Sequence, residues 1–361
     1  MNNIAFYISD HGFGHASRSI AIIRELIKKD NLKIHIKTSN PLEFIKNSLK
    51  DKDNIYFDYL ETDIGLILKK NSFELDKDLL VDKLKDWFKE WEILINKEYD
   101  FLINKDIDLV ISDITPWIFN SANKANIKSV AISNFTWYSQ YKEILADKNI
   151  NLTKIKEAYN KADLFIKYPF GLKVNNKNVI NTGLISRKFN QNKIKNKKNK
   201  IGNDKKLIYM GIGKSVDYDV LNNIDFNKLD QYNWLFSSGV EVEGDNIYKI
   251  PQNESETQNY IAACDYAVTK AGWSTISEAV LSKTPMLLIG REEIPEDRKI
   301  INKLVKEGLG IKIDKKKIYQ NDNLIKGLKK LKKIDIDNFD YQNKVKETAN
   351  IIFNHLKERS G

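Results

Sequence analysis

The sequence has few of the residues that staple a chain or anchor it in a membrane. Its 361 residues include one cysteine, Cys264, and four histidines, so neither an internal disulfide nor a Cys/His zinc site is expected. No run of about 18 apolar residues occurs, which argues against a membrane-spanning helix. The first residues, 1–9, have no basic region before their short apolar run, which predicts that the protein is not exported. We therefore expect a cytoplasmic protein, with peripheral attachment at the inner membrane face left open.

Proline and glycine are also scarce, with 6 and 16 residues, while 42% of the chain is hydrophobic and 30% is charged. This balance excludes a low-complexity or collagen-like chain and predicts a globular protein. At roughly 150 residues per domain, the length predicts two domains, each large enough to bury a core.

The net charge of +10 is concentrated in one stretch. Residues 186–206 contain nine lysine or arginine side chains against one acid, Asp204. The stretch lacks apolar periodicity and has one aromatic residue, Phe189, so it is more typical of a solvated linker than of a nucleic-acid surface. The predicted domains are an N-terminal domain (1–185), this basic linker (186–206), a C-terminal domain (207–340) and a closing helix (341–361).

Short apolar runs alternate with helical patterns in both halves, which is typical of parallel sheets covered by helices on both faces. The predicted strands are residues 4–9, 33–38, 55–60, 109–112, 129–133 and 164–167, then 207–210, 234–237, 247–250, 266–269, 286–289 and 310–313. The predicted fold class is α/β, with two Rossmann-like doubly wound domains facing each other across a cleft. Such sheets bind ligands at the carboxyl ends of their strands.

The first strand runs into a glycine-rich turn that contains Gly12, Gly14, His15 and Arg18. A turn of this kind directs backbone N–H groups and a helix dipole at an anion. It is not a dinucleotide fingerprint, because Ser17 occupies the third glycine position and Thr38, Ser39 and Asn40 stand at the end of the second strand, where that fingerprint has an acid. His15 is placed to take a proton from a sugar hydroxyl or to pair with phosphate; simple capping of the helix is the alternative.

The second half opens with a similar turn at Gly211, Gly213, Lys214 and Ser215. The last three residues resemble the end of an ATP-binding P-loop, but Ile208 stands where that motif needs its first glycine. A two-glycine turn is preferred to a P-loop ATPase or kinase.

A third glycine turn precedes the residues Trp273, Ser274, Thr275 and Glu278. Two interpretations are open. Thr275 and Glu278 have the spacing of a capping box, which needs no ligand. Alternatively, Gly272, Ser274 and Thr275 hold a diphosphate at the helix N-terminus, and Glu278 accepts hydrogen bonds from ribose hydroxyls.

Other side chains follow predicted strands in the first half. Asp113 and Trp117 follow one strand, and Trp137 and Tyr138 follow the next. The last two either stack on an acceptor sugar or anchor a packed loop. The bulky residues of 84–95 have helical spacing and predict a core helix, or an interfacial helix that docks on an anionic membrane.

The glycine turn GFGHASR, the stretch AGWSTISEA and the later Pro285 together resemble glycosyltransferases of the GT-B fold. The likeness is to the branch that contains the N-acetylglucosaminyltransferase of lipid-linked peptidoglycan synthesis. The segments GFGHASR, SDITPW and NFTWYSQY also resemble the glycosyltransferase-like N-terminal region of plant arabinokinases. The resemblance runs from about residue 4 to residue 313. Two positions depart from it: Lys283 stands where the family has glycine, and Asp297 replaces its glutamine.

The resemblance implies an N-terminal domain that binds the acceptor and a C-terminal domain that binds a nucleotide sugar. The expected donor-binding residues are Gly12, Gly14, Arg18, Gly211, Gly213, Lys214, Ser215, Gly272, Trp273, Ser274, Thr275, Glu278, Arg291 and Asp297. The expected acceptor-binding residues are Trp117, Trp137 and Tyr138.

The predicted activity is inverting transfer of a hexosyl or N-acetylhexosaminyl group from a nucleotide diphosphate sugar, with UDP preferred, to a glycan or lipid-linked acceptor of the cell envelope. Inversion is favoured because Met286 stands where retaining members have a second glutamate, eight residues after Glu278. Candidate bases are His15, Asp10 and Asp113. No metal or other cofactor is expected, because helix dipoles and positive charge can stabilise the departing diphosphate. A nucleotide-sugar hydrolase and a non-catalytic carbohydrate or RNA binder are the alternatives.

Overall fold

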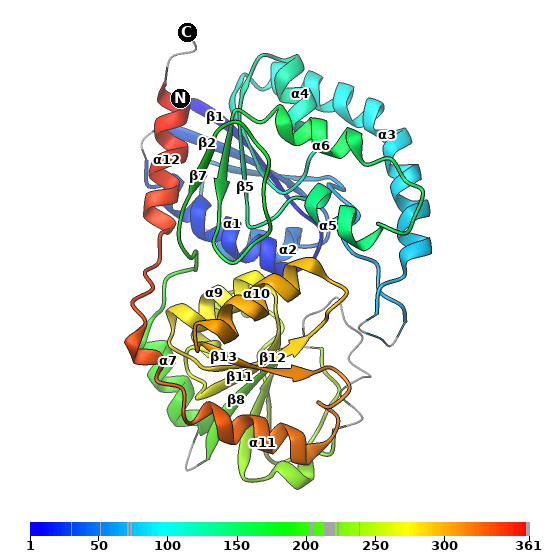
Figure 1. Ribbon diagram of the computed structural model, residues 1–361. Coiled ribbons are helices and arrows are strands. Elements are labelled where there is room, and N and C mark those ends of the chain that lie inside the picture. Colours follow the sequence, from blue (N-terminus) through cyan, green and yellow to red (C-terminus); the bar gives the residue numbers. More distant parts are fainter. Residues whose placement is uncertain are drawn as a thin grey trace. The chain divides into compact units, whose positions relative to one another are not determined.

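The structure is a computed structural model that describes residues 1–29, 31–50, 52–70, 72, 74–202, 205–212, 221, 224–237 and 239–358. It divides into two compact units (Figure 1). The first unit comprises Met1–Ile67, Asp76–Leu184 and Asn343–Gly361. The second comprises Leu68–Leu75 and Ile185–Gln342.

The first unit is built on a seven-stranded parallel sheet in the order β3-β2-β1-β4-β5-β6-β7. Its strands are β1 (Asn2–Ile8), β2 (Leu32–Thr38), β3 (Ile55–Tyr59), β4 (Ile107–Asp113), β5 (Lys128–Ser133), β6 (Leu164–Lys167) and β7 (Val179–Asn181). Its helices are α1 (Phe13–Leu26), α2 (Leu42–Leu49), α3 (Lys77–Asn104), α4 (Ile118–Lys124), α5 (Trp137–Ile144), α6 (Thr153–Asn160) and α12 (Val345–Lys357). Six of these strands match predicted ones; β7 escaped prediction because three residues are too few to show a pattern.

The second unit has a six-stranded parallel sheet in the order β10-β9-β8-β11-β12-β13. Its strands are β8 (Lys206–Gly211), β9 (Tyr232–Phe236), β10 (Ile247–Lys249), β11 (Tyr266–Lys270), β12 (Met286–Gly290) and β13 (Gly310–Asp314). Its α-helices are α7 (Gln191–Lys197), α8 (Gln258–Ile261), α9 (Trp273–Leu281), α10 (Pro295–Lys306) and α11 (Asn321–Leu331). All six strands were predicted, because strands buried on both faces have continuous apolar runs.

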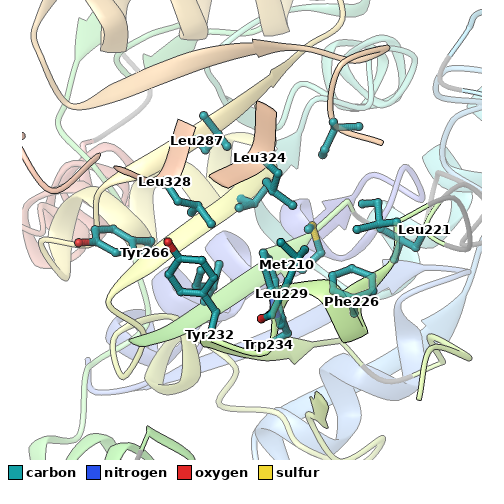
Figure 2. Packing of buried hydrophobic residues seen from close by; sticks show 14 of the residues in the cluster. Met210, Leu221, Phe226, Leu229, Tyr232, Trp234, Tyr266, Leu287, Leu324 and Leu328 are labelled. Atoms are coloured by element: carbon teal, nitrogen blue, oxygen red, sulfur yellow. The ribbon is translucent and has the colours of Figure 1, made fainter. Parts of the chain in front are cut away.

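A buried cluster on one face of the second sheet joins residues from several elements. Trp234 of β9 packs edge to face against Phe226, with ring centroids 5.2 Å apart. Figure 2 shows these two rings in one cluster with Leu324 and Leu328 of α11 and Leu287 of β12. Helix α11 therefore closes this face of the core, as expected for a sheet whose apolar faces must both be covered.

The stretch predicted to be a linker belongs largely to the second unit. Arg187 is buried, residues 191–197 form α7, and a π-helical turn (Lys198–Gly202) leads toward β8. The ammonium of Lys197 lies 3.4 Å from the centroid of the Tyr260 ring. The linker prediction is wrong for this part of residues 186–206, because lysines pack through their aliphatic stems and ring contacts while remaining solvated at their ends.

Helix α3, which contains the predicted helix 84–95, packs on the core of the first unit. Leu84, Trp87 and Trp91 are buried, and the two indole rings meet edge to face at 5.1 Å. The core interpretation of this stretch is therefore confirmed for its buried face.

The C-terminal helix α12 packs on the first unit. The ammonium of Lys29 lies 2.6 Å from the side-chain oxygen of Asn350 and 5.5 Å from the ring centroid of Phe353. The backbone N–H of Lys344 donates to the carbonyl of Leu184. The chain thus returns to the sheet on which it began.

Candidate functional site

Both sheets have a point at which the strand order reverses, and the glycine turns lie there. In the first unit this point lies between β1 and β4, which are neighbours although about a hundred residues separate them. In sheets of this kind, ligands bind outside the carboxyl ends of the strands at the point where the strand order reverses. Gly12 turns the chain into α1 with a φ of 82°, a conformation that favours glycine.

His15, Asp113 and Arg18 form a buried charged cluster at this point. Nδ1 of His15 lies 2.9 Å from Oδ1 of Asp113. Nε of Arg18 donates to Oδ2 of the same carboxylate at 2.7 Å, and Nη2 donates to Oδ1 at 2.5 Å. Ser19 adds a hydrogen bond to Oδ2 at 3.0 Å. Two residues that the sequence proposed separately as bases, His15 and Asp113, are therefore direct partners.

The contacts and charges of this cluster bear on the protonation of both Asp113 and His15. Burial by itself raises the pKa of Asp113, but the charges and hydrogen bonds of Arg18 and His15 outweigh it and lower that pKa to about 2. An ionised carboxylate only accepts hydrogen bonds, so the contact with Asp113 favours a neutral His15 with its proton on Nδ1, whereas Nη2 of Arg18, which can only donate, also lies 2.9 Å from Nδ1. In the tautomer that Asp113 favours, Nε2 holds the lone pair, which is the arrangement of a general base oriented by an acid.

Arg18 was expected to bind the donor, and the structure gives it a partner that the sequence did not predict. Its side chain is 2% exposed, and besides Asp113 its guanidinium donates to the side chains of Asn134 and Ser133. Arg18 thus fixes the carboxylate that orients His15.

Asp10, the third candidate base, holds the loops that follow β2 and β3. Its Oδ1 accepts hydrogen bonds from the backbone of Ser39 at 2.6 Å and from the hydroxyl of Thr38 at 3.0 Å. Its Oδ2 accepts from the backbone N–H of Thr62 at 2.6 Å. Both oxygens are therefore committed to backbone and side-chain donors of the unit itself, which assigns Asp10 a structural role.

Two of the predicted acceptor-binding aromatics are buried anchors. Trp117 and Trp137 have no exposed surface. The indole N–H of Trp117 donates to the carbonyl of Thr62, and that of Trp137 donates to Oδ2 of Asp63. The assignment of both residues to acceptor binding is corrected here, and for Trp137 the alternative of a packed loop anchor holds, because apolar rings with satisfied N–H groups are drawn into the core. Tyr138 remains half-buried.

Asp63 is a buried acid that sequence reasoning missed. Burial, together with the charge of Asp10, raises its pKa to about 7. Its Oδ1 has no hydrogen-bond partner among the described residues. Nothing in the surrounding sequence distinguishes this aspartate from a surface acid, since its burial arises from the packing of Trp137.

In the second unit the strand order reverses between β8 and β11, where two of the predicted glycine turns meet. The hydroxyl of Thr269 donates to the carbonyl of Gly211 at 2.7 Å and joins the ends of the two strands. Gly213, Lys214 and Ser215 lie outside the described residues, so Gly211 alone of that predicted turn is seen.

Helix α9 begins directly at the other turn, with Gly272 as its N-cap. Thr275 therefore lies inside the helix and does not cap it, which rules out the capping-box interpretation of Thr275 and Glu278. Trp273 and Ser274 are buried, and Thr275 is half-buried. A glycine N-cap has no side chain with which to satisfy the first N–H groups of the helix, the arrangement that suits an anion.

Glu278 lies in the second turn of α9 and is paired with Arg187. The carboxylate is 4% exposed, and Oε1 accepts a hydrogen bond from Nη2 of Arg187 at 2.9 Å. Burial raises the pKa of Glu278, and the guanidinium of Arg187 opposes that effect. Glu278 was predicted as a site residue, whereas Arg187 lay in the stretch predicted to be a linker.

A second buried ion pair and a lysine lie near this turn. Arg291 and Asp297, both proposed to bind the donor, bind each other through two hydrogen bonds of 2.5 and 2.8 Å. Burial and the positive charge of Arg291 lower the pKa of Lys270, at the end of β11, to about 8. Lys270 was not predicted, although its place two residues before Gly272 is the signal that would have identified it.

The described residues show no feature typical of a metal site or a membrane span. They contain no group of three or more His, Cys, Asp or Glu side chains placed to hold a metal ion. None of the helices formed by these residues has both the length and the apolar character needed to cross a bilayer.

Comparison with known proteins identifies the family. The family model described as glycosyl transferase family 1 matches residues 2–331. The chain belongs to glycosyl transferase family 1. It is 25% identical over 325 residues to the L-arabinokinase of Arabidopsis thaliana, a match that covers 83% of this chain and 29% of that protein.

A second relative is named for a transfer reaction. It is the UDP-N-acetylglucosamine-N-acetylmuramyl-(pentapeptide) pyrophosphoryl-undecaprenol N-acetylglucosamine transferase of Thermosipho africanus. This family 1 chain is 31% identical to it over 123 residues, which are 32% of this chain and 36% of the relative. The matches with both curated relatives thus span about a third of each relative's length.

Solved structures confirm the predicted GT-B fold. UGT89C1 of Arabidopsis thaliana, crystallised with UDP, has a TM-score of 0.64 and 11% identity, and the match covers 99% of this chain and all of that one. The calicheamicin glycosyltransferase CalG4 has a TM-score of 0.63 and 14% identity, with coverage of 99% and 94%. At these identities the likeness shows the fold alone.

Proposed function

We propose that this protein is an inverting glycosyltransferase that moves a hexosyl or N-acetylhexosaminyl group from a nucleotide diphosphate sugar, with UDP preferred, to a hydroxyl of a glycan or lipid-linked acceptor. The observation that carries the proposal is the buried cluster of His15, Asp113 and Arg18 at the strand reversal of the first sheet. It supplies an oriented base, which a single displacement at a sugar carbon requires.

In the proposed reaction the acceptor oxygen bonds to the anomeric carbon while the bond between that carbon and the diphosphate oxygen breaks. The electron pair of the broken bond leaves with the nucleoside diphosphate. The proton of the acceptor hydroxyl passes to Nε2 of His15, and the resulting imidazolium is stabilised by the ionised Asp113.

We propose that the second unit binds the donor. The opening of α9 at Gly272 and the partly buried Lys270 favour the diphosphate, and both supply positive potential without a metal ion. Glu278 has oxygen lone pairs beyond the one that Arg187 occupies, and these are proposed to accept the ribose hydroxyls.

The acceptor and location are proposed from the Thermosipho relative, whose name includes an undecaprenol-linked acceptor. A lipid-linked acceptor of the cell envelope would place the enzyme in the cytoplasm, peripheral at the inner membrane face.

Calorimetric titration tests the donor class. UDP, GDP, CDP and dTDP are titrated against the wild type and Glu278→Ala, with and without Mg²⁺, and Glu243→Ala serves as a matched control because Glu243 is an exposed acid of the same unit. We expect UDP to bind without Mg²⁺, and Glu278→Ala to weaken binding about 10–100-fold, the range for hydrogen bonds to a charged group.

Binding of none of the four nucleotides by the wild type would overturn the nucleotide-sugar proposal. Release of free sugar from the donor in the absence of any acceptor would favour a hydrolase. Binding without turnover, unaffected by His15→Ala, would favour a non-catalytic binder.

A further inference from the structure

The segment that follows the first unit is fastened to the helices of the proposed donor site. The hydroxyl of Ser277 in α9 donates to the carbonyl of Ile185 at 2.7 Å. Further along, the side-chain amide of Gln258 in α8 donates to the carbonyl of Lys188 at 3.0 Å. Residues 185–188 are thus held against α8 and α9, and this positions Arg187 between them.

The guanidinium of Arg187 is enclosed by acceptors from two elements. The side chain is 1% exposed. Nη1 donates to the carbonyl of Ser255, and Nη2 donates both to the hydroxyl of Thr257 and to Oε1 of Glu278, each at 2.9 Å. With the loop before α8 holding one side of the guanidinium, its orientation toward Glu278 is fixed independently of any ligand.

Glu278 depends on this partner for its charge. Burial raises the pKa of its carboxyl, the charge of Glu256 raises it further, and Arg187 is the group that lowers it. A buried carboxylate that loses its cationic partner takes up a proton instead of remaining ionised. A protonated carboxyl has one oxygen that donates, and it accepts hydrogen bonds more weakly than a carboxylate.

We propose that Arg187 is a positioning residue for donor binding, which orients the carboxylate of Glu278 and keeps it in the form that accepts the ribose hydroxyls. This inference rests on the proposed function and deepens it. It gives a defined task to a residue 91 positions distant from Glu278, in a stretch whose composition resembles a solvated linker.

The test compares UDP with 2′-deoxy-UDP, titrated between pH 5 and pH 8. The proteins are the wild type, Arg187→Gln, Arg187→Lys, and the control Lys206→Gln, which removes the ion pair of an exposed lysine with Asp265 in the same unit. The ratio of the two affinities reports the ribose hydroxyl alone, so a general loss of structure does not imitate the effect.

We expect the wild type and Lys206→Gln to prefer UDP. Arg187→Gln should lose most of that preference at neutral pH, and the pH below which UDP binding weakens should rise by about 1–3 units, the usual effect of removing an opposite charge. Arg187→Lys should lie between, because it keeps the charge but not the fork of donors.

This inference would be overturned if the wild type binds UDP and Arg187→Gln keeps both the wild-type preference for UDP over 2′-deoxy-UDP and the wild-type pH below which UDP binding weakens. The proposed function would then still stand. Failure of the wild type to bind UDP would overturn both. If Arg187→Gln does not fold, Arg187→Lys decides: full wild-type preference and pH dependence for UDP would refute the need for this guanidinium.

Discussion

The two units place different chemistry at the same point of the same topology. Both sheets have their first strand in the middle, next to the fourth, so each has one reversal of strand order with carboxyl ends on either side. In the first unit that point holds the His15–Asp113–Arg18 cluster. In the second it holds glycine turns, the start of α9 and Lys270. The topology determines where a site can form, and the residues that follow the strands determine what it does.

The charge balance differs between the two points. Asp113 is buried with a strong cationic partner, and its lowered pKa reflects that compensation. The pKa of Lys270 is lowered first by burial and then by the nearby cation Arg291, and the charges of Asp297 and Glu296 only partly offset these effects. The first arrangement suits proton transfer by a neighbouring base, and the second suits an anionic ligand.

The largest effect is expected for His15→Ala, which tests whether the first unit supplies the base and the second unit binds UDP. If the first unit supplies the base, turnover should fall about 10²–10⁴-fold while UDP affinity stays unchanged. Steady-state kinetics and calorimetry on the same preparation measure the two effects. His355→Gln is the matched control, since His355 lies on α12. A loss of UDP affinity equal to the loss of turnover would contradict the assignment of the base to the first unit and of UDP binding to the second.

Asp10→Asn distinguishes a structural acid from a catalytic one. The new amide group faces the backbone N–H of Thr62, which now lacks its acceptor, so the free energy of unfolding should fall by about 1–3 kcal/mol. Chemical denaturation measures it, with the exposed Asp100→Asn as control. Turnover per folded molecule should be unaffected; a loss comparable to that of His15→Ala would return Asp10 to the list of candidate bases.

The positive potential of the second unit is tested by pH. Because the pKa of Lys270 is lowered to about 8, its charge is lost as the pH rises through that value, and the affinity for UDP should weaken by up to about tenfold per pH unit above it. Because Lys270→Arg stays charged, its UDP affinity should not weaken as the pH rises above about 8. Calorimetry from pH 7 to pH 10 measures it, and an identical alkaline limb in Lys270→Arg would show that another group is responsible.

The smallest effect concerns a departure from the family pattern. Lys283, which stands where the family has glycine, has a φ of 58° just after α9. This left-handed conformation costs a side chain about 1 kcal/mol, so Lys283→Gly should stabilise the protein by roughly that amount in thermal unfolding. Ser282→Gly, at a φ of −91°, should give no gain. A Lys283→Gly variant no more stable than the wild type would mean that other contacts of the lysine offset the strain.

The elements of the fold were largely predictable, whereas the partners within each site were not. All twelve predicted strands overlap observed ones, because burial on both faces imposes apolar runs that are visible locally. His15 and Asp113 were each found from their positions after strands, but their pairing across 98 residues arises only when β1 and β4 become neighbours. The assignment of Trp137 to acceptor binding failed for the same reason, because the surroundings of an aromatic ring decide whether it packs in the core or is exposed to a ligand.

The sequence by itself determined the two α/β units, their glycine turns and the choice of His15 and Glu278 as candidate site residues. These features depend on local periodicity and backbone freedom. Tertiary structure alone decided that His15 is oriented by Asp113, that Arg18 stabilises Asp113 and that Arg187 forms an ion pair with Glu278. The physical reason is that the energy of a charge depends on burial and on partners within a few ångströms. Neither burial nor these partners can be inferred from distance along the chain.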